Sequence, residues 1–130
     1  EGGTKNLCCA EGAMTKDECK SAILAGKQTA KKHGDEGCEV LVLGEVGIGN
    51  TTSASALICA LTGADPKLVC GPGTGLDEQG VMRKVDIVTR ALKTHSETIR
   101  KGDIIEILAA LGGLEIAAMA GAFVQARQGG

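Results

Sequence analysis

The sequence predicts an α/β fold: part of a doubly wound, Rossmann-like parallel sheet with flanking helices, truncated at both ends. Val40–Leu43 is a short continuous run of β-prone residues, as expected for a strand buried on both faces of a parallel sheet. A glycine-rich loop follows this run and leads into an Ala-rich helical segment. The 130 residues suffice for one domain and are too few for two, so we expect residues 1–130 to form the central part of a single domain.

Both ends of the chain indicate a segment of a longer domain. The chain begins at Glu1 rather than at a methionine, and it ends on Gly130 directly after a helical pattern. The order helix, turn and strand before the glycine loop suggests one arm of a right-handed crossover to a strand that the sequence does not clearly contain. We therefore expect N-terminal and C-terminal segments of the domain to be absent.

Capping signals and glycines mark the first two helices. Thr15 and Glu18 predict a capping box, in which each side chain accepts a hydrogen bond from the backbone of the other residue. This helix is expected to end at Gly34. The helix after the glycine loop is expected near residues 53–61, with its end at Thr62-Gly63.

A second glycine loop, Gly71–Gly75, leads into a helix of about residues 76–94. Four apolar residues at helical spacing predict that one face of this helix is buried: Val81, Val85, Val88 and Leu92. Asp103 and Glu106 predict a second capping box for the next helix, which Gly112-Gly113 should end. A last helix over 114–128 is rich in small residues and should pack tightly against a neighbour.

The first glycine loop contains Gly44, Gly47 and Gly49, and the next four residues could each cap the following helix: Asn50, Thr51, Thr52 and Ser53. A glycine loop between a strand and a helix directs free N–H groups and the positive helix end at one spot, where a phosphate can bind. A purely structural turn is the alternative, and glycine content alone does not separate the two. The spacing matches neither the dinucleotide fingerprint nor the nucleoside-triphosphate loop.

Glu45 and Lys84 are the charged candidates near this loop. A carboxylate would repel a phosphate, so Glu45 is expected to reach a sugar hydroxyl, a substrate N–H or a lysine; a solvated loop glutamate is the alternative. Lys84 lies about 60° from Val81 around its helix, at the edge of the buried face. Its ammonium either reaches an anion held by the glycine loops or snorkels to solvent or to a nearby acid.

Composition argues against several classes of protein. The net charge is −2 and Phe123 is the single aromatic residue, so the basic surface and stacking side chains of nucleic-acid binding are missing. No apolar run approaches about 18 residues, and no leader is visible in this stretch, so we expect no membrane span and a cytoplasmic location.

Six cysteines raise the question of disulfides or zinc, and their spacing argues against both. There is no C-x-x-C pair, and the two histidines, His33 and His95, lie in polar helical contexts. We interpret the cysteines as reduced thiols that serve as small core residues. No metal site is expected.

Three segments, GEVGIGNTTSASAL, GPGTGLDEQGVMRKVDIV and LGGLEIAAMAGA, closely resemble in order and spacing the nicotinate-nucleotide:dimethylbenzimidazole phosphoribosyltransferase family. The early segment GTKNLCCAEGAMTKDECKSAILAG is similar to that family's GT-x-N…AMT region. The resemblance covers essentially all 130 residues, which correspond to the central part of a family member.

The resemblance implies phosphoribosyl transfer from nicotinate mononucleotide to 5,6-dimethylbenzimidazole or a related base. The products would be nicotinate and α-ribazole 5′-phosphate, the precursor of the lower ligand of cobalamin. It also implies a doubly wound α/β domain in a homodimer, with small-molecule substrates, no metal and no cofactor. A non-catalytic nucleotide-binding or regulatory homologue that keeps the phosphate loops is the alternative.

Carried over residue by residue, the resemblance places the nucleotide-phosphate contacts on Gly47, Gly49, Asn50, Thr51 and Lys84, with Gly73 helping to enclose the phosphate. Glu45 would lie between the ribose and the incoming base, and Val46 would touch the base. The family's general base is a glutamate near its C-terminus, beyond Gly130, which leaves Glu45 as a supporting candidate. The N-terminal family segment that forms much of the base pocket is also absent, so the 130 residues alone are expected to be inactive.

Overall fold

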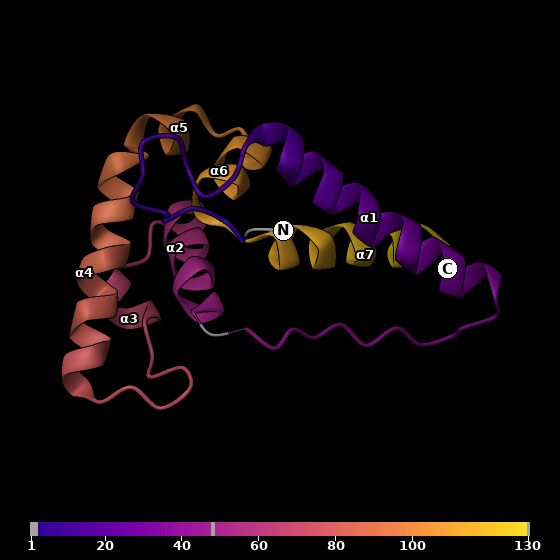
Figure 1. The fold of residues 1–130 in the computed structure, drawn as a ribbon, viewed down its shortest axis with the longest axis horizontal. Helices are drawn as coiled ribbons and strands as arrows, with labels where there is room; N and C mark the ends of the chain where they lie inside the picture. Colours follow the sequence, from indigo (N-terminus) through magenta and orange to yellow (C-terminus); the bar gives the residue numbers. More distant parts are fainter. Residues whose placement is uncertain (1–2, 48, 130) are drawn as a thin grey trace.

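The computed structural model of the chain describes residues 3–47 and 49–129. Within these residues every regular element is an α-helix, and Figure 1 shows the helices in chain order. They are α1 (Lys16–Asp35), α2 (Asn50–Thr62), α3 (Pro66–Val69), α4 (Glu78–Thr94), α5 (Ser96–Lys101), α6 (Ile104–Leu111) and α7 (Leu114–Gly129).

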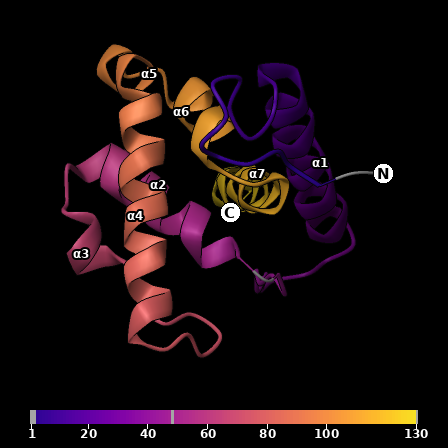
Figure 2. The same cartoon turned by 60° about the vertical axis from the view of Figure 1, so that its left-hand side comes forward.

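The helices form two groups that meet at α6 (Figures 1 and 2). In one group α1 packs against α7, and in the other α2 packs against α4, while α6 contacts both α1 and α2. The largest fully buried side chains are Leu111 of α6, Val88 of α4 and Cys19 of α1. The hydrophobic core therefore lies around α6, where the two groups join.

Glycines bring α1 and α7 into close contact. A Cβ atom on Gly26 would overlap the carbonyl oxygen of Ala118, and a Cβ atom on Gly121 would overlap the carbonyl oxygen of Ile23. Because neither glycine carries a side chain, the two helix backbones approach more closely than larger residues would allow. The prediction of tight packing by the small residues of the last helix is thus confirmed.

The predicted capping box at the start of α1 is confirmed. The backbone N–H of Glu18 donates to Thr15 Oγ1 over 3.2 Å, and the backbone N–H of Thr15 donates to Glu18 Oε2 over 2.7 Å. The helix ends at Asp35, one residue beyond the predicted Gly34. The predicted ends of α2 at Thr62-Gly63 and of α6 at Gly112 are also confirmed.

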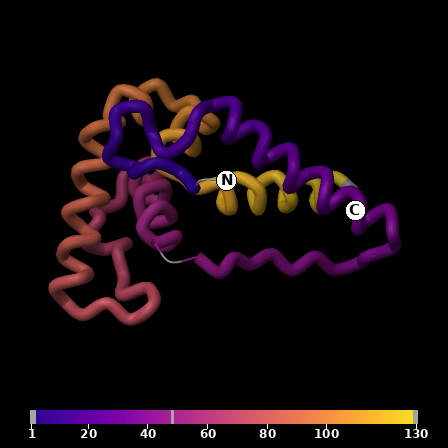
Figure 3. The backbone as a smooth tube through the Cα atoms, in the orientation of Figure 1, coloured from indigo at the N-terminus to yellow at the C-terminus, as the bar shows by residue number. Residues whose placement is uncertain are grey.

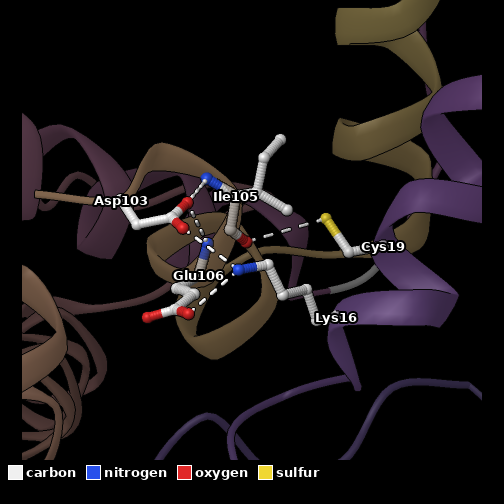
Figure 4. A network of polar contacts seen from close by, with 5 residues as sticks. All are labelled: Lys16, Cys19, Asp103, Ile105 and Glu106. Atoms are coloured by element: carbon white, nitrogen blue, oxygen red, sulfur yellow. Dashed lines mark hydrogen bonds and ion pairs between the residues drawn. The ribbon is translucent and has the colours of Figure 1, made fainter.

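The second predicted capping box is only half formed (Figure 4). Asp103 caps α6 by accepting from the backbone N–H groups of Ile105 and Glu106. The Glu106 carboxylate instead accepts from Lys16 Nζ at 2.9 Å, and Asp103 Oδ2 accepts from the same ammonium at 3.0 Å. A lysine on α1 therefore competes for the carboxylate that would have completed the box, and this ion-pair network ties α1 to α6.

The predicted buried face of α4 is confirmed for Val85 and Val88, which are buried, whereas Val81 and Leu92 are half-buried. The cysteine prediction holds for Cys19, Cys59 and Cys70, which are buried and unpaired, whereas Cys38 is exposed and is not a core residue. Burial raises the pKa of the Cys19 thiol and of the Cys59 thiol, which favours their neutral form.

The predicted strand is not part of a sheet in the described residues, none of which forms a β-strand. Val40–Leu43 belongs to an extended run that links α1 to α2 below α7 in the view of Figure 3. Val40 is 75% exposed and Val42 is 87% exposed, in contrast to the predicted burial on both faces. A strand needs a neighbour that pairs with its backbone N–H and C=O groups, and no such neighbour lies beside this run in the described part of the chain.

Across residues 3–47 and 49–129, the structure contains no helix with the length and apolar character needed to cross a bilayer.

Candidate functional site

Lys84 joins three separate parts of the chain. Its ammonium donates to Thr51 Oγ1 on α2 over 2.8 Å and to the carbonyl oxygen of Gly71 in the second glycine loop over 3.1 Å. Lys84 lies on α4 and only 4% of its surface is exposed. The packing of α4 on α2 thus brings this lysine to the start of α2.

The burial of Lys84 argues against a snorkelling or ion-paired lysine. A snorkelling lysine would expose its ammonium, and an ion-paired lysine would face a carboxylate. The hydrogen-bond partners of the ammonium in the described residues, a hydroxyl and a carbonyl, are both uncharged. A buried cation among neutral acceptors is favourably placed to bind an anion, because burial of a charge is costly without a counter-charge.

Gly73 places the backbone of the second loop against the same two side chains. Its φ is +58°, a left-handed conformation that suits glycine. A Cβ atom on Gly73 would lie 2.9 Å from Thr51 Oγ1 and 3.7 Å from Lys84 Nζ. The structure therefore brings Thr51, Gly73 and Lys84 into one cluster.

The N-terminus of α2 lies beside this cluster. Helix α2 begins at Asn50, earlier than the predicted 53–61, and the cap residue is Gly49 with φ +93°. None of the four polar residues after the loop acts as the cap, and the cap residue Gly49 makes no side-chain hydrogen bond to the first turn. The Thr52 N–H donates to the Gly49 carbonyl oxygen over 2.9 Å, and the positive end of the helix dipole lies at the start of α2.

The other loop residues lie around Gly47. A Cβ atom there would lie 2.7 Å from Glu45 Oε2 and 3.8 Å from the Cβ of Asn50, so the partly buried Glu45 folds back toward the start of α2. Val46 is fully exposed, at 108%, and the structure does not bring it to any of these groups. Ile48 lies outside the described residues.

Sequence reasoning missed Glu115, at the start of α7. Asn50 Nδ2 donates to Glu115 Oε1 over 2.6 Å, across 65 residues of sequence. The only local signal was an acidic residue in the first turn of a helix that follows a glycine pair, which ordinarily indicates a favourable interaction with the helix dipole.

No group of three or more His, Cys, Asp or Glu side chains is arranged to hold a metal ion in residues 3–47 and 49–129. A cavity of about 530 Å³ lies elsewhere, between the end of α1, the extended run and the end of α7. Its lining includes His33, Cys38 and Gln125. The Lys84 cluster at the start of α2 is separate from this cavity, whose lining includes neither Thr51, Gly73 nor Lys84.

Comparison with known proteins places the chain among phosphoribosyltransferases. The sequence profile of a family described as phosphoribosyltransferase matches residues 1–130. The curated protein named nicotinate-nucleotide:dimethylbenzimidazole phosphoribosyltransferase from Solidesulfovibrio magneticus is 47% identical over 124 residues, which are 95% of this chain and 35% of that protein. The protein of the same name from Pseudomonas aeruginosa is 44% identical over 98% of this chain and 36% of its own length.

Solved structures give the same result for the fold. A crystal structure of CobT from Thermus thermophilus is 41% identical in sequence and superposes with a TM-score of 0.83, covering 96% of this chain and 36% of that one. A second structure from the same organism, titled as the dimethylbenzimidazole phosphoribosyltransferase, has a TM-score of 0.79 at 40% identity. The chain spans about a third of the length of the curated relatives it matches. Because the family profile matches residues 1–130 and these relatives cover at least 95% of the chain, the chain belongs to the nicotinate-nucleotide:dimethylbenzimidazole phosphoribosyltransferase family.

Proposed function

We propose that this chain is the nucleotide-holding segment of a phosphoribosyltransferase that acts on nicotinate mononucleotide and 5,6-dimethylbenzimidazole or a related base. The reaction would release nicotinate and form α-ribazole 5′-phosphate for the lower ligand of cobalamin. The names of the relatives support this proposal. The observation that carries it is the buried Lys84 ammonium, which lies between Thr51 and Gly71 at the start of α2.

The cluster has the chemistry of a phosphate cradle. Thr51 Oγ1 accepts a hydrogen bond from Lys84, so its own hydroxyl hydrogen is free to donate to a phosphate oxygen. The Lys84 ammonium and the positive N-terminal end of α2 supply further attraction for a phosphate. Because helices α2 and α4 hold these groups, a bound phosphate would be fixed with little reorganisation, and much of the rate of such a transfer comes from positioning.

Glu45 is proposed to act on the ribose of the nucleotide rather than on its phosphate. Displacement of nicotinate from the anomeric carbon develops positive charge on the ribose, and a carboxylate near that carbon stabilises this charge. The attacking azole nitrogen must also lose a proton from its partner N–H, which needs a carboxylate at hydrogen-bond distance. We assign that base to a part of the polypeptide outside these 130 residues, with Glu45 as a supporting group and Val46 as a contact to the base.

The parallel sheet belongs to the same proposal. Val40–Leu43 is extended, apolar and exposed, and a cavity of about 530 Å³ lies along the run that contains it. We propose that strands from the remaining two-thirds of the polypeptide, as judged from the length of the relatives, pair with this run. The homodimer and the cytoplasmic location expected from the resemblance are likewise proposals.

The test is a product assay on the full-length protein that contains this chain. Incubation with nicotinate mononucleotide and dimethylbenzimidazole should yield α-ribazole 5′-phosphate and nicotinate, both separable by chromatography. The isolated 130 residues should yield none. A full-length protein that binds the nucleotide by calorimetry but forms no product would contradict the proposal and support the non-catalytic alternative.

A further inference from the structure

Asn50 is held from outside its own helix. As the first residue of α2 it could cap the turn or face solvent, yet its Nδ2 donates to Glu115 Oε1 over 2.6 Å. The bond links the first turn of α2 to the first turn of α7. A bond between a neutral donor and a carboxylate is charge-assisted and stronger than one between neutral groups.

Local structure places the Glu115 carboxylate there. Helix α7 begins with the bond from the Ala117 N–H to the Gly113 carbonyl, of 3.0 Å. Gly113 carries no side chain, and a Cβ atom at that position would overlap the Glu115 carboxylate oxygens. The carboxylate thus lies back over the start of its helix, where the helix dipole also favours a negative charge.

This contact sets the orientation of the Asn50 amide. A carboxylate can only accept, so the nitrogen of the amide faces Glu115 and the Oδ1 acceptor is turned away from it. An acceptor oxygen repels phosphate oxygens and suits an O–H donor. Glu45 Oε2 lies 2.7 Å from the Cβ position of Gly47, which is itself 3.8 Å from the Asn50 Cβ, so a second carboxylate lies near the start of α2.

Asn50 and Thr51 therefore present opposite chemistry. As consecutive residues of a helix they project about 100° apart. Thr51 contacts the buried Lys84 ammonium, whereas Asn50 contacts a carboxylate. The start of α2 consequently has a cationic side suited to phosphate and an anionic side suited to hydroxyl groups and to developing positive charge.

We propose that Glu115 is a positioning residue that orients the Asn50 amide so that Oδ1 accepts a hydrogen bond from a ribose hydroxyl of the nucleotide. The inference rests on the proposed function and deepens it. It assigns Asn50 to the sugar, whereas the family resemblance placed this residue on the phosphate. Glu115 itself touches no substrate in this assignment and acts only through Asn50.

The test is a double-mutant cycle in the full-length protein with Glu115→Gln and Asn50→Ala. Glutamine keeps the volume of the side chain, but its amide can donate as well as accept, so the Asn50 amide loses its preferred orientation. Glu115→Gln should raise the KM for nicotinate mononucleotide up to about tenfold, the equivalent of the hydrogen bond from a ribose hydroxyl to the amide oxygen, with kcat changed less than about threefold. In the Asn50→Ala background the same change should alter KM less than about twofold.

Deoxy analogues of the substrate distinguish a contact to the sugar from a contact to the phosphate. For the wild-type protein, the 2′-deoxy or the 3′-deoxy analogue of nicotinate mononucleotide should show a KM about tenfold higher than the natural nucleotide, and Asn50→Ala should abolish this difference. Glu97→Gln is the matched control, because it also removes a carboxylate from the first turn of a helix, α5, where its partner is Arg100. This control should leave KM and kcat unchanged.

Two results would overturn this inference while leaving the proposed function intact. One is that Glu115→Gln changes KM equally in the wild-type and the Asn50→Ala backgrounds. The other is that Asn50→Ala still shows the wild-type difference in KM between the natural nucleotide and both deoxy analogues. Should Asn50→Ala fail to fold, Asn50→Ser, which shortens the side chain but keeps it polar, takes its place in the cycle. A wild-type protein with no turnover contradicts the proposed function, and with it this inference.

Discussion

The Lys84 ammonium lies 2.8 Å from the Thr51 hydroxyl oxygen, and this contact joins the buried face of α4 to the first turn of α2. The two residues are 33 positions apart in the sequence. The ammonium and the N-terminal end of α2 are both positive, so together they attract an anion. The first two predictions below follow from this relationship.

Replacement of Lys84 by alanine in the full-length protein should weaken nucleotide binding. A hydrogen bond from a charged donor to phosphate acts on the substrate and the transition state alike, so KM for nicotinate mononucleotide should rise on the order of 10- to 100-fold while kcat changes much less. Steady-state kinetics measure both constants. Lys93→Ala is the control, because Lys93 is an exposed lysine on the same helix. An unchanged KM in Lys84→Ala would remove this lysine from the site.

Gly73→Ala should damage the site more than Gly75→Ala. Both glycines have positive φ, at +58° and +111°, so both substitutions strain the backbone by about 1–2 kcal/mol. Only at position 73 would the new Cβ also press on the Thr51 hydroxyl, 2.9 Å away, since nothing lies within 4 Å of a Cβ at position 75. Urea denaturation should show similar losses of stability for the two variants, and kinetics should show a raised nucleotide KM for Gly73→Ala alone. Equal KM values would mean that the loop backbone does not approach the phosphate.

Gly26→Ala should destabilise the packing of α1 on α7. The added methyl group would overlap the Ala118 carbonyl oxygen, so the helices must separate, at a cost of about 1–3 kcal/mol in the free energy of unfolding. Gly34→Ala on the same helix is the control, because nothing lies within 4 Å of a Cβ there and alanine favours helix by up to about 1 kcal/mol. Urea unfolding of the chain compares the two. Equal midpoints would contradict the close approach of the helices.

The Lys16 network should make stability depend on pH at both extremes. The hydrogen bonds from Lys16 and from the Glu106 N–H hold the pKa of Asp103 below its ordinary value of 3.8, and the backbone N–H of Thr15 lowers the pKa of Glu18 below 4.5. These carboxylates contribute stability above their unfolded values, and the contribution is lost as pH falls through the lower folded pKa. Denaturation midpoints should therefore fall on acidification below about pH 4.

The contribution of Lys16 to stability has the opposite pH dependence. Hydrogen bonds to Glu106 and Asp103 raise its pKa above 10.5, so its contribution is complete below that value and is lost as pH rises through the folded pKa. Lys16→Met should remove the alkaline loss and reduce the acid loss, with Lys31→Met as an exposed-lysine control whose ion pair lies within α1 alone. The three ion-pairing side chains are 40–42% exposed, so the pH dependence of stability should weaken in high salt. A pH profile unaltered by Lys16→Met would contradict the network.

The backbone amide hydrogens of Val40–Leu43 should exchange with solvent at different rates in the isolated 130 residues and in the full-length protein. In the 130 residues alone they lie in an exposed extended run, and exchange should be fast. In the full-length protein the proposed sheet would pair them, and hydrogen exchange followed by mass spectrometry should show strong protection. Fast exchange in both forms would rule out the sheet at this position.

The sequence by itself determined the features that depend on near neighbours. The Thr15–Glu18 capping box spans three residues, the apolar stripe of α4 repeats every three or four, and glycine ends α2 and α6. Short-range hydrogen bonds and helical periodicity can be recognised from a short stretch of sequence. The family resemblance likewise named Thr51, Gly73 and Lys84, which the structure brings together, and Val46, which it does not.

Only the tertiary structure decided the relationships between distant parts of the chain. Periodicity placed Lys84 at the edge of a helix face, but the packing of α4 on α2 made it a buried cation bound to Thr51. The Asn50–Glu115 bond crosses 65 residues and left no pattern in either segment. The Val40–Leu43 run has the composition of a strand, yet a strand forms only when another segment pairs with its backbone, and that partner is a property of the assembled domain rather than of the run itself.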